Sequence, residues 1–178
     1  QATLEGEKTD RPPVALWRHF PVDDQSPETL AAATLNFQQT YDFDIVKVTP
    51  ASSFSIRDWG AEDKWAGHTE GTRQYTKRVI NEPMDWEKLS ELDMNATHLA
   101  GQLACLRFIR QTLSPDTPLL QTVFSPLAQA KNLAGNEMLL SHIRQHPEAV
   151  MKGLETIAKT TKKFVEATME IGVDGIFY

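Results

Sequence analysis

Short apolar runs separated by long segments of helical periodicity constrain the fold of this chain more than any other feature. Four such runs are candidate strands, at residues 13–17, 44–48, 118–124 and 174–178. The third run is apolar almost throughout, which is typical of a strand covered on both faces of a parallel sheet. Strands that alternate with helices predict right-handed crossovers, so we expect an α/β protein with a parallel sheet.

The helical segments begin and end at residues with known capping preferences. Ser26 and Pro27 predict a helix start, with a hydroxyl cap followed by proline in the first turn. Helical spacing resumes over residues 86–113, and we expect one continuous stretch there. Pro147 opens the longest helix, and Gly172 ends it. Two shorter helices are expected at residues 127–133 and 137–145.

The number of strand–helix units predicts a barrel rather than an open sheet. Four units in 178 residues give roughly 44 residues per unit, against about 31 in a typical (β/α)8 barrel. An inserted segment accounts for the excess. A doubly wound sheet is the alternative, but the glycine-rich phosphate-binding turn of such folds is absent. We therefore predict a partial (β/α)8 TIM barrel, its first four βα units, in a single domain over residues 1–178.

The last candidate strand has no further strand with which to pair. An uncovered apolar strand edge invites pairing with another chain. We expect either that the carboxyl-terminal half of the barrel lies outside this sequence or that a partner supplies it, as in a homo-oligomer.

Residues 51–82 form a segment of a different kind, a predicted flap inserted after the second strand. Its glycines and the alternating Tyr75 and Val79 indicate irregular loop plus a hairpin. A long loop inside a compact domain is usually functional or disordered, and the rings of Trp59 and Trp65 argue against disorder. Two alternatives follow: a roof over a ligand pocket, or a packed flap without chemistry.

Charge and cysteine content exclude several classes of function. The chain has 18 Lys and Arg against 24 Asp and Glu, a formal net charge of −6, so its overall field repels nucleic acid and anionic membrane surfaces. No apolar run approaches the ~20 residues of a membrane span. One cysteine permits neither an internal disulfide nor a cysteine-clustered zinc site, so we expect no metal site in these residues and a cytoplasmic location.

Polar residues that follow the candidate strands are the best candidates for a site, because catalytic groups in parallel barrels lie after the carboxyl ends of the strands. This rule nominates Arg18, His19, Thr49, Ser125 and Asn132. Arg18 is the strongest of them, since a guanidinium can hold a carboxylate through two parallel hydrogen bonds. The alternative for Arg18 is a structural ion pair with Asp23 or Asp24.

Histidines and the cysteine give weaker candidates. His19 is a candidate general base, because its reference pKa lies near neutrality, but successive residues at a strand end point opposite ways, so it is not expected to share a pocket with Arg18. His98, His142 and His146 fall on helices and are expected at the surface or as caps. Cys105 lies among apolar helix residues and is expected to be an unreactive core thiol.

Several segments together carry a family resemblance. They are residues 6–14 (GEKTDRPPV), Trp17-Arg18, residues 42–48 (DFDIVKV), residues 124–127 (FSPL) with 133–135 (LAG), and residues 172–176 (GVDGI). Their order and spacing resemble the uroporphyrinogen decarboxylase superfamily, which joins the haem-pathway decarboxylase to cobalamin-linked methyltransferases on a common (β/α)8 barrel. The resemblance covers the whole chain, but only the amino-terminal half of the family's barrel.

The resemblance implies roles for three positions. Arg18 matches the first arginine with which the decarboxylase binds the acidic side chains of its tetrapyrrole; the glutamine and second arginine of that region are absent. Thr49 falls where the decarboxylase has its essential aspartate, and Asn132 where it has a tyrosine. Cofactor-free decarboxylation needs a group that stabilises a protonated pyrrole, and neutral Thr49 is a poor substitute for a carboxylate.

The methyltransferase branch of the superfamily activates a thiol at a zinc site of His and Cys ligands. The resemblance places those ligands in the carboxyl-terminal half of the barrel. We therefore expect no cofactor within these residues, and zinc only through residues outside this sequence.

The function expected from these arguments is an enzyme that acts on a polycarboxylate tetrapyrrole or a corrinoid-linked substrate, with methyl transfer slightly favoured over decarboxylation. One alternative is a uroporphyrinogen decarboxylase, a lyase of porphyrin and haem biosynthesis. The other is a non-catalytic binding or assembly protein built on a half barrel. The expected catalytic residues are Arg18, Thr49 and Asn132. The expected substrate-binding residues are Arg18, His19, Trp59 and Ser125.

Overall fold

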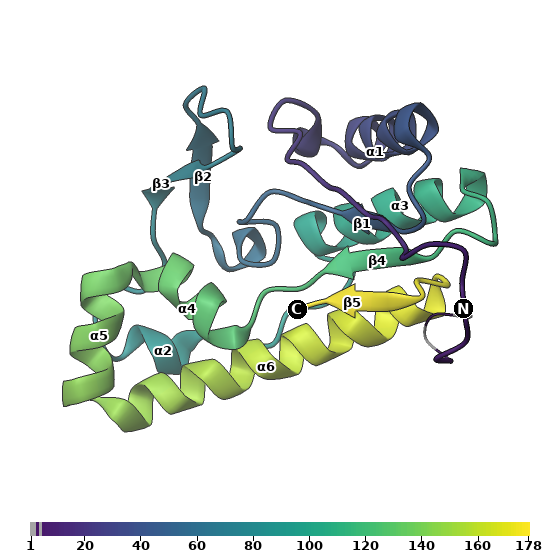
Figure 1. Cartoon of the computed structure of the whole chain (residues 1–178). Coiled ribbons are helices and arrows are strands. Elements are labelled where there is room, and N and C mark those ends of the chain that lie inside the picture. The colour runs from purple at the N-terminus through teal and green to yellow at the C-terminus, as the bar shows by residue number, and fades with distance from the viewer. Residues whose placement is uncertain (1–2, 4) are drawn as a thin grey trace.

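The computed structural model describes residue 3 and residues 5–178, and folds them into a short parallel sheet with helices packed along it (Figure 1). The strands are β1 (Val46–Val48), β2 (Glu62–Trp65), β3 (Arg73–Lys77), β4 (Leu119–Thr122) and β5 (Gly175–Phe177). The helices are α1 (Pro27–Tyr41), α2 (Asp85–Lys88), α3 (Thr97–Thr112), α4 (Pro126–Ala134), α5 (Asn136–Gln145) and α6 (Pro147–Glu170). No helix in the described part of the chain has the length and apolar character to cross a membrane.

The central sheet confirms three of the four predicted strands. β1, β4 and β5 lie side by side in that order, and both pairs are parallel. Their residues are in register, with Lys47 opposite Leu120 and Leu120 opposite Gly175. The predicted hairpin is β2 paired antiparallel with β3, and it stands away from the sheet in Figure 1.

The prediction of a strand at residues 13–17 is wrong. This segment is extended but carries no ladder of strand pairing. Its backbone is linked to the residues just before β1 by a hydrogen bond that the Asp44 N–H donates to the Val14 carbonyl, at 2.9 Å. Pro12 and Pro13 have no N–H to donate, so the segment starts without the groups that a ladder needs.

The same segment is held to the sheet by the Asp44 carboxylate instead. Arg11 donates to both carboxylate oxygens, at 2.5 and 2.9 Å, and the Val14 N–H donates at 2.7 Å. These hydrogen bonds, first that from Arg11 and then that from Val14, lower the pKa of Asp44 to about 2.

We expect an NMR titration to show the low pKa of Asp44 directly. Because the folded-state pKa lies below the usual 3.8, the ion pair stabilises the fold above that pH, and its contribution is lost as the pH falls from about 4 towards 2. Arg11→Gln removes the guanidinium that donates to both carboxylate oxygens, and it should raise the pKa of Asp44 towards 3.8. An unchanged pKa in the variant would show that Arg11 does not set it.

Two predicted helix starts are confirmed. α1 begins at Pro27, and the Ser26 hydroxyl accepts a hydrogen bond from the Thr29 N–H at 3.2 Å. α6 begins at Pro147 and runs for 24 residues. Gly172 follows its end with φ of +90°, a left-handed backbone angle that favours glycine.

The prediction of one continuous helical stretch over residues 86–113 is wrong, because α2 ends at Lys88 and α3 begins at Thr97. The Asp93 carboxylate accepts the Asn95 N–H at 2.8 Å and so makes a local turn that competes with helix. The Asp58 carboxylate accepts the N–H groups of His98 and Leu99 in the first turn of α3, at 3.0 to 3.1 Å. A side chain distant in sequence thus fixes where α3 starts.

Trp86 on α2 forms a buried contact with α5 and α6. Its indole N–H donates to Nδ1 of His142 at 3.0 Å, so the prediction of His142 as a surface or capping residue is wrong. Both side chains are buried. On α6, a Cβ at Gly153 would lie 2.6 Å from Cε3 of Trp86, so only glycine lets this helix approach the ring without displacement.

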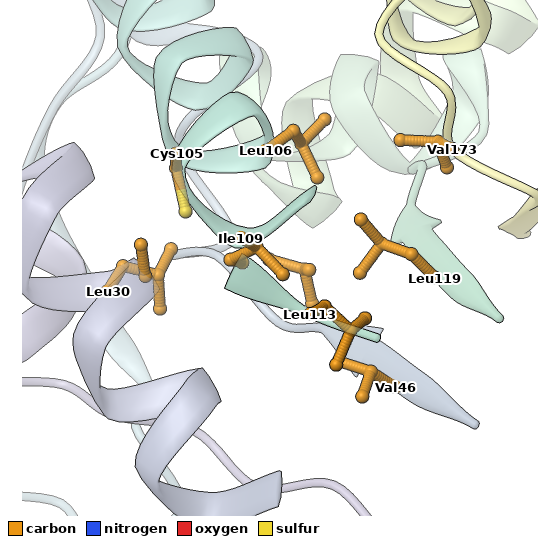
Figure 2. Packing of buried hydrophobic residues seen from close by; sticks show 10 residues of the cluster. Leu30, Val46, Cys105, Leu106, Ile109, Leu113, Leu119 and Val173 are labelled. Atoms are coloured by element: carbon orange, nitrogen blue, oxygen red, sulfur yellow. The ribbon is translucent and has the colours of Figure 1, made fainter. Parts of the chain in front are cut away.

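A separate apolar cluster fills the space between the sheet and helices α1 and α3. Figure 2 shows Leu106 and Ile109 of α3 facing the strands, with Leu119 and Val46 opposite them. Cys105 lies in this cluster as predicted, and its burial raises the pKa of the thiol to about 12. The thiol is therefore protonated at neutral pH and packs as an apolar group.

Candidate functional site

The face of the sheet turned away from α1 and α3 is the candidate site. Val46 and Val48 pack into the helix-covered cluster, so strand alternation puts Lys47 on the opposite face. The register places Leu120 and Gly175 at the level of Lys47, and Phe177 nearer the carboxyl ends of the strands. In a (β/α)8 barrel this face lines the interior, and the carboxyl ends of the strands carry the chemistry.

Arg18 is exposed at the end of the extended segment. Its Nε donates to the His19 carbonyl at 3.3 Å, and its guanidinium lies 5.4 Å from the centre of the Phe20 ring. Among the described residues, no carboxylate lies within ion-pair distance of it, and Asp24 pairs with Arg73 instead. The ion pair that was the alternative for Arg18 is therefore not formed with Asp24. The guanidinium is available to an anion.

The Asp24–Arg73 ion pair fastens the flap to the segment before α1. The side chains are 1% and 2% exposed. Arg73 opens β3, whereas Asp24 lies in a short 3₁₀ helix over residues 23–25. Sequence reasoning considered Asp24 only as a partner of Arg18, because nothing in the local spacing connects it with a flap residue.

His19 packs against the flap rather than beside the Arg18 head group. A Cβ at Gly71 would lie 2.6 Å from the His19 Cβ, and Gly71 has φ of +69°. Partial burial lowers the pKa of His19, with the positive charge of Lys47 acting in the same direction and Asp24 opposing it. The imidazole is therefore neutral at pH 7, as a general base must be.

Thr49 and Ser125 follow β1 and β4 as predicted, but their hydroxyls differ in state. Thr49 is 4% exposed, and its Oγ1 has no hydrogen-bond partner among the described residues. Ser125 caps α4, where its Oγ accepts the Ala128 N–H at 3.2 Å. Thr49 thus keeps its hydrogen-bonding capacity, whereas Ser125 uses one acceptor position for the helix.

Asn132 lies at a meeting point of α4 with the flap. Its backbone carbonyl accepts from Nη1 of Arg78 at 2.7 Å, and its side chain faces the Tyr75 hydroxyl. The same hydroxyl lies 3.3 Å from Oγ of Ser52, after β1. Burial raises the pKa of Tyr75, against the opposing hydrogen bond from Ser52. A tyrosine hydroxyl from the flap therefore lies beside Asn132, the position at which the resemblance places a tyrosine.

Trp59 helps to hold the flap in place. Its indole N–H donates to the Ser90 carbonyl at 2.8 Å, and its ring packs on the apolar cluster that contains Ile80 and Trp86. Trp59 therefore holds residues 57–59 to the segment after α2, and it does not lie beside Arg18.

Sequence reasoning missed Lys47, which the structure places on the open face. Its Nζ lies 4.2 Å from the centre of the Trp17 ring and 3.9 Å from that of Phe177. The signal was present, because Lys47 is the one charge in the apolar run Ile45 to Val48. Among the residues that the structure describes, no three His, Cys, Asp or Glu side chains converge in an arrangement that would hold a metal.

Comparison with known proteins places this chain in a family. The family model described as uroporphyrinogen decarboxylase (URO-D) matches residues 1–178. The chain belongs to the uroporphyrinogen decarboxylase family, which confirms the predicted family. A search of curated proteins gave no match.

A solved structure supports the fold. A methyltransferase from Methanosarcina mazei superposes with a TM-score of 0.83 at 17% sequence identity. The superposition covers 98% of this chain and 56% of that one. At this identity the likeness concerns the fold alone, and it confirms the predicted partial (β/α)8 barrel, because this chain spans about half the length of the barrel protein it matches.

Proposed function

We propose that this protein is an enzyme of the uroporphyrinogen decarboxylase family that binds an acidic tetrapyrrole or corrinoid-linked substrate and transfers a methyl group rather than releasing carbon dioxide. Arg18 is the anion anchor, Thr49 and Asn132 line the pocket, and the flap over residues 51–82 is its roof. Family membership and the exposed guanidinium of Arg18, which has no carboxylate partner among the described residues, support an acidic substrate.

The state of Thr49 is the observation that favours methyl transfer. The resemblance places the essential aspartate of the decarboxylase at this position, and the structure has a buried, neutral hydroxyl there. A neutral hydroxyl offers no negative charge to a protonated pyrrole, so the intermediate of decarboxylation lacks its main electrostatic stabiliser. The fold likeness to a methyltransferase agrees with this choice without deciding it.

Product analysis tests the choice. The full-length protein, supplied with zinc, is incubated with uroporphyrinogen, and the oxidised products are separated by their number of carboxylates. In parallel it is incubated with methylcobalamin and a thiol. The absorbance spectrum is followed as the thiol loses its proton and takes the methyl group, while the electron pair of the cobalt–carbon bond stays on cobalt as cob(I)alamin. We expect methyl transfer and no loss of carboxylates. Appearance of products with fewer carboxylates would overturn the proposal, as would binding of both compounds with neither reaction.

Arg18→Ala is expected to weaken the binding of uroporphyrin, an oxidised polycarboxylate tetrapyrrole, by about tenfold or more, because a charge-assisted hydrogen-bonding group is removed. The unfolding midpoint should stay near that of the parent, since Arg18 is exposed. Fluorescence titration and a urea melt measure the two quantities.

Arg144→Ala on α5 is the matched control, because it removes the same exposed side chain at a distance from the strand ends. It should leave uroporphyrin binding unchanged. Equal binding by Arg18→Ala and Arg144→Ala would remove Arg18 from the site.

A further inference from the structure

Lys47 projects into the open side of the barrel wall. It is the middle residue of β1, and both of its strand neighbours pack on the helix-covered side of the sheet. Its partner in register is Leu120, whose own partner Gly175 has no side chain. Leu120 therefore stands between Lys47 and Gly175, and beyond Leu120 no side chain rises from the sheet at this level.

Two aromatic rings hold the amine of Lys47. Nζ lies 4.2 Å from the centre of the Trp17 ring and 3.9 Å from that of Phe177, and the two rings are 5.2 Å apart with their planes at 58°. Phe177 is in register with Thr122, two residues nearer the carboxyl ends of the strands than the level of Lys47. The amine is thus carried towards the end of the sheet where substrate binds in a barrel.

The amine has aromatic neighbours but no acidic partner. Among the described residues, no carboxylate lies within ion-pair distance of Nζ, while ten other cation–carboxylate contacts are formed elsewhere. Partial burial lowers the pKa of Lys47, as expected for an ammonium without a counter-charge. Asp24, which acts on the neighbouring His19, is already paired with Arg73.

We propose that Lys47 is a substrate-binding residue whose ammonium pairs with a carboxylate of the ligand at the open face of the sheet. The two rings fix the direction of the amine and leave a hydrogen-bonding position for an anion. Arg18 directly follows Trp17, whose ring contacts the Lys47 amine. The site therefore offers two separate cations, which suits a ligand with several carboxylates. This inference rests on the proposed function, because it names how the acidic substrate is held.

Two variants isolate the charge from the packing. Lys47→Met keeps an unbranched stem between the rings and removes the charge, and we expect uroporphyrin binding to weaken by about tenfold or more. Lys47→Arg keeps the charge and should retain binding to within about threefold. Lys64→Met, on the exposed strand β2, is the matched control and should bind as the parent does.

A second measurement does not depend on the tetrapyrrole. Lysines are reductively methylated with carbon-13, and the Lys47 resonance is assigned by its loss in Lys47→Arg. Titration with mellitate, a small polycarboxylate, should move this resonance and leave that of Lys64 in place. Circular dichroism confirms that each variant is folded.

The outcomes separate the two proposals. Uroporphyrin bound equally by the parent protein and Lys47→Met would overturn the role of Lys47 and leave the proposed substrate class standing. A mellitate-dependent shift at Lys47 without uroporphyrin binding would uphold the anion site and overturn the substrate class. Absence of both effects would overturn both.

Discussion

Replacing Arg73 by methionine is expected to destabilise the protein by about 3–5 kcal/mol, as is typical when one member of a buried ion pair is removed. The variant leaves the Asp24 carboxylate nearly fully buried without its cation, since the side chains are 1% and 2% exposed in the native pair. Urea denaturation followed by tryptophan fluorescence measures the free energy of unfolding.

The double variant Asp24→Leu/Arg73→Met tests whether the loss arises from the uncompensated charge. Replacing a whole buried ion pair by apolar groups is often close to neutral, so the double variant should recover much of the stability lost in Arg73→Met. Lys77→Met is the matched control in the same hairpin strand, because Lys77 pairs with Glu62 in solvent. A midpoint for Arg73→Met equal to that of Lys77→Met would show that the buried pair does not stabilise the fold.

Trp86→Ala is expected to destabilise the protein by about 3–5 kcal/mol, the usual range for truncating a buried aromatic side chain to alanine. The change opens a cavity between α2, α5 and α6 and removes the N–H that donates to Nδ1 of His142. Thermal and urea unfolding both measure the loss. A change below about 1 kcal/mol would mean that the helices close over the cavity.

Gly153→Ala provides a companion to the tryptophan variant. Its new Cβ would lie 2.6 Å from the Trp86 ring, and such overpacking costs about 1–3 kcal/mol, while alanine favours the helix by about 1 kcal/mol. In the Trp86→Ala background the clash is absent, so Gly153→Ala should no longer destabilise. Equal effects in the two backgrounds would show that the ring does not require the glycine.

Local chemistry made part of this fold predictable. Ser26 with Pro27, and Pro147, mark helix starts because the cap and the proline act within one turn of the chain. The strands β1 and β4 were visible because buried parallel strands are short apolar runs, and β5 was visible as an apolar run although its side chains are partly exposed. The break between α2 and α3 was not visible, since it depends on Asp58, which reaches the start of α3 from 40 residues earlier.

The candidate site divides in the same way. Thr49 was predicted because the carboxyl end of a strand is a position that sequence reveals, whereas the prediction of Arg18 relied on residues 13–17, which form no strand. The Asp24–Arg73 pair joins residues 49 positions apart, and no periodicity links them. Lys47 was a single charge in an apolar strand, and only the structure showed that its amine lies against the rings of Trp17 and Phe177.

The long helix α6 has a consequence for how the molecule opens. At 1.5 Å per residue its 24 residues span about 36 Å. Val150 and Ile157 belong to the apolar cluster around Trp86, Phe164 belongs to a second cluster with Phe54 and Leu99, and Val173 just beyond the helix belongs to the cluster over the sheet. The helix and the residues just beyond it therefore connect three apolar clusters that are otherwise separate. Because the unfolding of any one cluster disturbs α6, we expect the three clusters to unfold cooperatively. Amide hydrogens at the centre of α6 should be among the slowest to exchange.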